Sequence, residues 1–301
     1  MTKKRLTIFL VSTFVLTWAY ALVFVYPYAN ATTAEELSMF QLYMAATMFI
    51  PAICVVLTRL ITKEGFKNSM IKPNFKGNIK TYLLAYFGPS VLTVLGAVVY
   101  FIIFPDQFDI NCSYLLKSYE TMGVDVSTLP MAANLLMLSQ GLTAILFGPI
   151  INFFTCFGEE WAWRGYMVPK MAESMKTIPM LLVSGVIWGL WHAPLTIIGH
   201  NYGVGYLGYP FTGILTMCLF CTVLGVFMAY ITLKTKSCIP AVLAHGAINA
   251  FASIAIYFTF DGGNPFIGPA PIGIVGMIGF IVVDIFLVKA LMKMENTVEV
   301  E

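Results

Sequence analysis

Charged side chains are scarce in this sequence, and their scarcity excludes most classes of soluble protein. They make up 11% of the 301 residues, whereas soluble domains carry about 25%. The formal net charge of +2 is too small to indicate a nucleic-acid partner, because the lysines form short clusters beside apolar runs. Apolar residues, by contrast, reach 59%. This balance predicts an integral membrane protein that contacts the lipid bilayer and binds no nucleic acid.

Cysteine is also uncommon, and the six cysteines do not have the spacing of a disulfide framework. Only Cys112 lies in a clearly polar loop. Cys218 and Cys221 form a CxxC pair, but they lie inside an apolar segment without further ligands, so we interpret them as small packing residues. The remaining cysteines lie in or beside apolar segments: Cys54, Cys156 and Cys238.

Long apolar runs predict the architecture. A spanning helix satisfies its backbone hydrogen bonds internally, and about 20 apolar residues cross the bilayer. The chain has about eight such runs joined by short loops, which predicts an all-α fold, a polytopic transmembrane helix bundle. We treat residues 1–301 as a single integral membrane domain. The expected spans are 6–28, 39–61, 81–104, 132–157, 178–198, 211–233, 239–258 and 271–292, and the fourth can extend through Val168.

The first apolar run resembles a signal peptide, because residues 1–5 are basic and residues 29–31 form a small-residue site. Its length argues against cleavage, since a signal core has about 7 to 15 residues. Lysine and arginine clusters flank the expected spans on one side, whereas the opposite loops are mainly acidic. By the positive-inside rule, we expect a multi-pass protein with both termini in the cytoplasm.

Ionisable residues within the spans are candidates for function, because a charge at the bilayer centre costs about 2.5 to 3.5 kcal/mol on insertion scales. Glu160 and Arg164 are four residues apart, so they share a helix face and can form an ion pair. Glu159 lies about 100° around the helix and cannot share Arg164 equally. A less compensated carboxylate in low dielectric suits a general base. The alternative is a salt bridge at the membrane interface, with both glutamates among the headgroups.

Two later spans carry further polar side chains. His245 and Asn249 share one helix face, and both can donate hydrogen bonds to the charge that develops on a carbonyl oxygen during acyl transfer. They could equally serve as polar contacts between helices. His192 lies one turn after Trp188, and Pro194 is expected to kink the helix just after it. A lone buried histidine is often a packed core residue. The prediction therefore rests on the three groups together: the glutamate pair, His192, and His245 with Asn249.

Two other ionisable residues are not expected to act in catalysis. His200 falls in a predicted outer loop. Asp284 lies five residues before Lys289, and we expect the two to form an ion pair at the membrane interface.

At these positions the sequence resembles the CAAX protease and bacteriocin-processing (CPBP) family of intramembrane endopeptidases. Residues 188–192 match its aromatic-x-x-x-His motif, and residues 245–249 match its His-x-x-x-Asn/Asp motif. Trp188 departs from the phenylalanine common there, but the position is one of aromatic packing. With their flanks the motifs cover residues 132–258, the expected catalytic core. The Glu-Glu-x-x-x-Arg motif reads Glu159-Glu160-Trp161-Ala162-Trp163-Arg164.

The resemblance implies an intramembrane endopeptidase that acts on a peptide or protein, lipidated in some relatives. Glu159 and His192 would activate a water molecule, and His245 with Asn249 would stabilise the oxyanion. Glu160 and Arg164 would hold the geometry of the site. The family likeness is to a glutamate protease without a metal cofactor, and the chain contains no His-Glu-x-x-His motif. All these side chains should then converge on one hydrated cavity that opens toward the cytoplasm or into the bilayer.

Other interpretations of the same residues stay open. Glu159, His192 and His245 could bind zinc and leave a fourth position free. Cys156, one turn before Glu159, could act as a nucleophile, although an unpaired thiol in an apolar helix is usually inert. The polar residues could also form the binding site of a transporter, a channel or an immunity-type protein.

Overall fold

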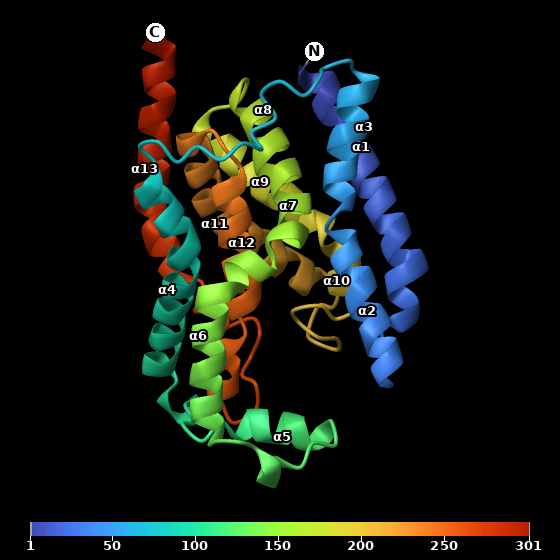
Figure 1. Ribbon diagram of the computed structural model, residues 1–301, viewed down its shortest axis with the longest axis vertical. Helices are drawn as coiled ribbons and strands as arrows, with labels where there is room; N and C mark the ends of the chain where they lie inside the picture. Colours follow the sequence, from blue (N-terminus) through green and yellow to red (C-terminus); the bar gives the residue numbers. More distant parts are fainter. Residues whose placement is uncertain (1, 301) are drawn as a thin grey trace.

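The computed structural model describes the backbone of residues 2–300 and the side chains of residues 2–296. Within this part the chain is helical and forms no β-strand, only isolated bridges, which confirms the predicted all-α bundle. In the described residues, 6 helical segments are long and apolar enough to cross a membrane, and shorter apolar helices accompany them. Figure 1 shows that the N- and C-termini lie at the same end of the molecule.

The N-terminal half begins with two long helical hairpin arms. Thr33 starts the second arm with a capping box: its hydroxyl accepts from the Glu36 N–H, and the Glu36 side chain accepts from the Thr33 N–H. The arm breaks just before Pro51, so the predicted second span consists of two helices. The elements are α1 (Thr2–Tyr20), η1 (Ala21–Val25), η2 (Tyr26–Tyr28), α2 (Ala34–Thr47), α3 (Ile50–Ile61), α4 (Ile79–Ile103) and the short α5 (Ser113–Thr121).

The C-terminal half holds the predicted core. The fourth span breaks at Asn152, and its path then continues past Val168, as the sequence allowed. The Asn152 side chain donates to the carbonyl of Gly148 at 3.0 Å and to that of Gly246 at 3.3 Å, which ties the break to the neighbouring α12. The elements are α6 (Ala133–Ile151), α7 (Phe153–Ala162), the π-helix η5 (Trp163–Met167), α8 (Val168–Ala172), α9 (Thr177–Trp191), α10 (Ala193–Ile197), α11 (Phe211–Thr235), α12 (Ile239–Phe251), η6 (Ile254–Phe258) and α13 (Ile278–Val300).

The predicted start of the last span is wrong by one to two turns. Residues 271–277 form turns, and the helix begins at Ile278. This segment is apolar, so hydropathy alone does not separate it from the helix. Its glycines explain the turns, because a Cβ on Gly276 would lie 1.9 Å from the carbonyl oxygen of Ala270. Such close backbone contact is open only to glycine.

Helices α9 and α11 pack closely at the centre of the bundle. Gly185 and Gly189 lie one turn apart on α9 and make this approach possible. A Cβ on either glycine would lie 2.4 Å from a backbone atom of α11, at Thr222 and Cys218 respectively. Cys218 therefore packs against a helix neighbour, as interpreted from the sequence. All six cysteines are free.

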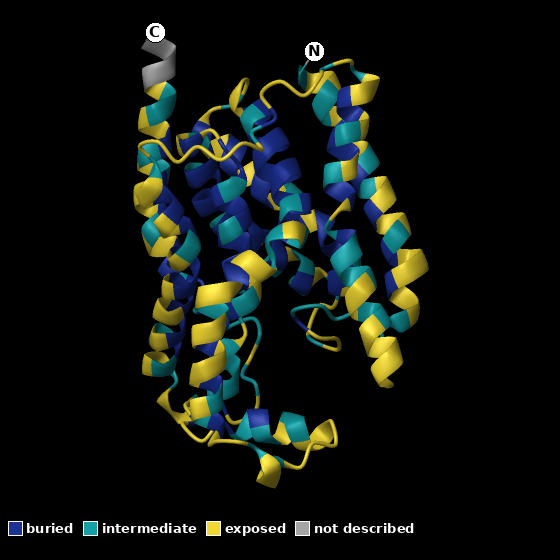
Figure 2. Cartoon of the chain, viewed as in Figure 1, coloured by how far each residue is buried: buried dark blue, intermediate teal, exposed yellow. Residues whose placement is uncertain are grey.

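The exposed faces of the bundle are apolar. Leu22 on η1, Ile102 on α4 and Leu142 on α6 are 64%, 73% and 61% exposed. Figure 2 shows buried residues concentrated on the central helices, while the outer faces of α1, α2 and α6 are exposed. Apolar side chains on this scale suit a lipid environment. The protein is therefore an integral multi-pass membrane protein.

Candidate active site

Polar side chains from separate helices meet at one cavity inside the bundle. The cavity has a volume of about 390 Å³, within the range of about 300 to 1,000 Å³ typical of ligand sites. Glu159 comes from α7, His192 from the junction of α9 and α10, and His245 and Asn249 from α12. The structure thus brings together the four side chains that were predicted from the sequence to be catalytic. Their roles stay a prediction.

Glu159 is held by the indole of Trp188. The Trp188 Nε1–H donates to Glu159 Oε2 at 2.9 Å, and both side chains are buried. Glu159 Oε1 makes no hydrogen bond to the described part of the chain. One carboxylate oxygen is therefore fixed by the protein, and the other is left for a molecule in the cavity.

His192 lies at the break between α9 and α10, two residues before Pro194, which was expected to kink the helix at this point. Its Nδ1 lies 2.9 Å from the Trp188 carbonyl oxygen. A carbonyl oxygen only accepts, so Nδ1 carries the proton and donates. In the neutral ring, Nε2 then keeps its lone pair. This tautomer makes Nε2 available as a hydrogen-bond acceptor.

One carboxylate oxygen of Glu160 accepts hydrogen bonds from two side chains. Its Oε1 accepts from Arg164 at 3.0 Å and from His245 Nδ1 at 2.8 Å. The predicted pairing of Glu160 with Arg164 is therefore confirmed, and His245 is an additional partner. The Arg164 guanidinium also stacks over the Trp188 ring, 3.8 Å from its centroid. All of these groups are buried, and together they fix the relative positions of α7, α9 and α12.

Asn249 is exposed and forms part of the cavity wall. Its Nδ2 lies 3.6 Å from the Cys156 thiol, which is a weak interaction. The amide can therefore turn toward a bound group. Cys156 itself is fully buried and is not among the side chains that line this cavity.

His200 is a wall residue that the sequence did not reveal. It follows α10 and lines the same cavity as Glu159 and His192. The break at His192 turns the chain back, since the His200 N–H donates to the Leu195 carbonyl at 3.0 Å. Burial lowers the pKa of His200 below the usual 6.5. His200 lies beyond the end of α10 at Ile197, so helical periodicity does not reach it, and only the turn could have indicated this position.

The expected ion pair of Asp284 with Lys289 is wrong. Asp284 is buried and makes no ion pair within the described residues, and its Oδ1 has no hydrogen-bond partner. Lys289 is exposed. The two side chains lie on different faces of α13 because five residues correspond to about 500°, or 140° beyond a full turn.

No group of three histidine, cysteine, aspartate or glutamate side chains within the described residues is placed to hold a metal ion. Glu159, His192 and His245 line one cavity. Each imidazole uses Nδ1 for Trp188 or Glu160 and keeps Nε2, so the zinc interpretation stays a prediction.

Comparison with known proteins shows a likeness over the segment that holds these residues. Residues 141–251 match the family described as type II CAAX prenyl endopeptidase Rce1-like. The predicted family resemblance is confirmed. The chain is also similar to the CAAX prenyl protease 2 of Methanococcus maripaludis, with 25% identity over 243 residues, which cover 80% of this chain and 82% of that protein. The match of 141–251 contains Glu159, Trp188, His192, His245 and Asn249, and it lies inside the expected core of residues 132–258. The likeness is thus to membrane endopeptidases that act on peptides or proteins.

Proposed function

We propose that this protein is an intramembrane endopeptidase in which Glu159 activates the attacking water. The observation that carries the proposal is the convergence of Glu159, His192, His245 and Asn249 on one cavity within the bundle. A base that activates water and donors that stabilise the developing oxyanion are the parts that amide hydrolysis requires.

In the proposed first step, water lies between Glu159 Oε1 and His192 Nε2. Glu159 takes a proton from the water while the water oxygen bonds to the carbonyl carbon of the substrate. His192 accepts a second hydrogen bond and so orients the water. When the tetrahedral intermediate collapses, the C–N bond breaks and the proton on Glu159 passes to the departing amine nitrogen.

His245 and Asn249 are proposed to stabilise the oxyanion. Because His245 Nδ1 donates to Glu160, its Nε2 can donate only when the ring carries a second proton. The proposed donor is therefore an imidazolium beside a carboxylate. Asn249 adds the neutral amide donor. Removing one oxyanion donor costs about 100- to 1,000-fold in kcat in a well-studied hydrolase.

The substrate is proposed to be a lipidated peptide. The matched family and the archaeal relative are both named for prenyl substrates. The cavity wall includes Met44, Leu195 and Phe220 beside the polar side chains, so it can accept an apolar group next to an amide. The shared end of the two termini is proposed to face the cytoplasm, in line with the lysine and arginine clusters.

The decisive experiment is cleavage of prenylated and unmodified peptides by purified protein in proteoliposomes. Glu159→Gln is expected to abolish cleavage and to leave thermal unfolding unchanged, because glutamine still accepts the Trp188 hydrogen bond. The exposed Glu120→Gln, which lines neither the catalytic cavity nor the basic cavity, provides the matched control and should cleave normally. Cleavage by Glu159→Gln at the wild-type rate would exclude Glu159 as the base.

The same preparations separate the other interpretations. Full activity in samples with less than stoichiometric zinc excludes a zinc enzyme that uses Glu159, His192 and His245. Activity of Cys156→Ala excludes a cysteine nucleophile. Solute flux across the liposome membrane together with no cleavage of any tested peptide would favour a transporter or binding protein.

A further inference from the structure

A second and larger cavity lies at the end of the bundle where the two termini lie. Its volume is about 830 Å³, and within the described residues it shares no lining residue with the catalytic cavity. Residues 62–78 cross this end of the bundle (Figure 1), and residues 64 and 66–72 of this segment form one wall of the cavity. The segment is fixed: Trp161 Nε1 donates to the Ser69 carbonyl at 3.0 Å, and the Cys238 N–H donates to that of Met70 at 2.8 Å.

The cavity is strongly basic. Two glutamates, Glu64 and Glu173, also line it. Six cations against two carboxylates leave a formal excess of four positive charges. The cationic lining residues are Arg5, Arg59, Lys67, Lys72, Lys170 and Lys236.

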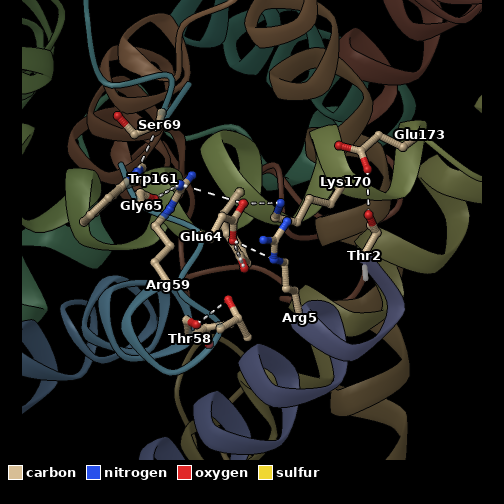
Figure 3. A network of polar contacts seen from close by, with 12 residues as sticks. Thr2, Arg5, Thr58, Arg59, Glu64, Gly65, Ser69, Trp161, Lys170 and Glu173 are labelled. Carbon is tan, nitrogen blue, oxygen red and sulfur yellow. Dashed lines mark hydrogen bonds and ion pairs between the residues drawn. The ribbon is translucent and has the colours of Figure 1, made fainter. Parts of the chain in front are cut away.

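Three of these cationic side chains surround the carboxylate of Glu64. Lys170 Nζ lies 2.5 Å, Arg5 Nε 3.5 Å and Arg59 Nη1 3.8 Å from Glu64. Figure 3 shows these side chains pointing toward Glu64 from separate parts of the chain. A single carboxylate neutralises only one of these three charges, so the floor of the cavity stays positive.

Arg59 provides an unpartnered donor at this floor. Its side chain is 2% exposed, and Arg59 Nη1 donates to the Gly65 carbonyl at 2.7 Å. Arg59 Nε is buried and has no hydrogen-bond partner. A buried guanidinium N–H without a partner is costly, and an anion that enters the cavity could satisfy it.

The position of the cavity relative to the bilayer indicates the source of such an anion. Arg5 lies in the first turn of the apolar segment Thr2–Tyr28, and Arg59 lies in the last turn of the segment Ala34–Ile61. Both side chains therefore sit at the level where a bilayer places its headgroups. The lysines at the rim, Lys67, Lys72 and Lys236, are exposed and form no ion pair within the described residues.

We propose that this cavity binds the phosphate of an anionic phospholipid headgroup. The phosphate oxygens accept from Arg59 and from the Arg5 and Lys170 side chains around Glu64, and the rim lysines add long-range attraction. The floor includes Tyr166 and Lys170, which follow Arg164 along the same helical path. The site is therefore built on the segment that carries Glu159 and Glu160, yet its existence does not depend on the proposed catalytic roles.

The test is native mass spectrometry of the purified protein with phosphatidylglycerol or phosphatidylcholine of identical acyl chains. Wild-type protein is expected to retain phosphatidylglycerol preferentially. The combined variant Lys67→Gln, Lys72→Gln, Lys236→Gln should weaken this retention by about tenfold or more. These lysines are exposed, so the variant is expected to fold. The matched control removes three exposed lysines from the same end that do not line the cavity: Lys63→Gln, Lys76→Gln, Lys80→Gln.

The outcomes are distinct. Loss of phosphatidylglycerol only in the cavity variant supports the site. Equal loss in both variants shows general surface attraction and overturns it, as does equal retention of the two lipids by the wild-type protein. Inorganic phosphate is added as a further probe. If it binds to the same cavity lysines and displaces phosphatidylglycerol at similar concentration, the ligand is a soluble phosphate and the lipid assignment is wrong.

Discussion

The indole N–H of Trp188 donates a hydrogen bond to Glu159 Oε2 across 2.9 Å. The same residue receives the Nδ1–H of His192 on its carbonyl oxygen and lies under the guanidinium of Arg164. Trp188 is thus in contact with each of these groups of the candidate site. A phenylalanine, common at this position in the resembled family, could pack in the same way but could not orient Glu159.

Trp188→Phe is therefore expected to lower kcat while KM changes little. A hydrogen bond to a charged group contributes about 1.5 to 3 kcal/mol, so the loss should be about tenfold to 100-fold. Trp191→Phe is the matched control, because its buried indole N–H donates to the Thr17 hydroxyl at 2.9 Å and not to Glu159. Steady-state kinetics on one peptide measures both. A wild-type kcat in Trp188→Phe would show that this bond does not position Glu159.

Glu160 is expected to matter for stability as well as for activity. Glu160→Gln leaves the buried Arg164 without its charged partner and weakens the bond to His245. Breaking a buried ion pair from one side costs about 3 to 5 kcal/mol. Glu160→Gln should therefore unfold at a clearly lower temperature, whereas Glu159→Gln should not, although both lose cleavage. Thermal unfolding in detergent compares them, and equal midpoints would contradict the division into a base and a positioning residue.

Glu64 predicts a specific pH dependence of stability. Burial raises the pKa of Glu64, but hydrogen bonds from Lys170 and Tyr166 and the charges of Lys170 and Arg59 outweigh it and lower the pKa below the usual 4.5. A carboxyl whose pKa is lower in the folded state stabilises the protein above its unfolded pKa. This stabilisation is lost as the pH falls from about 4.5 through the folded pKa.

The unfolding temperature of wild-type protein in neutral detergent should consequently drop over this range by more than that of Glu64→Gln. The exposed Glu120→Gln, which has no ion pair within the described residues, should follow the wild-type curve. Parallel curves for wild-type protein and Glu64→Gln would show that Glu64 does not stabilise the fold through its charge.

Local spacing predicted part of the candidate site, and tertiary packing supplied the rest. The pairing of Glu160 with Arg164 follows from a separation of four residues on a helix, and it is present. The bond from Trp188 to Glu159 depends on how α9 lies against α7, which the spacing of residues along either helix does not encode. His200 reaches the cavity through a turn after the break at His192, and no periodicity indicates such a turn.

The fold shows the same limit. Apolar runs located the spans, because a lipid-exposed helix must be apolar along its length. The apolar runs did not indicate the break at Asn152, where the Asn152 side chain donates hydrogen bonds to the carbonyls of Gly148 and Gly246. They also placed the start of α13 too early, since the glycine-rich turns before Ile278 are as apolar as the helix itself.

Asp284 gives the last prediction, because the ion pair expected for it is absent. Its carboxylate is buried on α13, and Oδ1 has no partner. A buried polar group without a hydrogen bond costs about 1 to 3 kcal/mol in protein mutational data. Asp284→Leu, which keeps the branched shape and the number of heavy atoms, is therefore expected to raise the unfolding temperature. Lys289→Gln, the control for the expected pair, should leave it unchanged. A lower unfolding temperature for Asp284→Leu would show instead that this carboxylate holds a stabilising partner, and a lower temperature for Lys289→Gln would identify Lys289 as that partner.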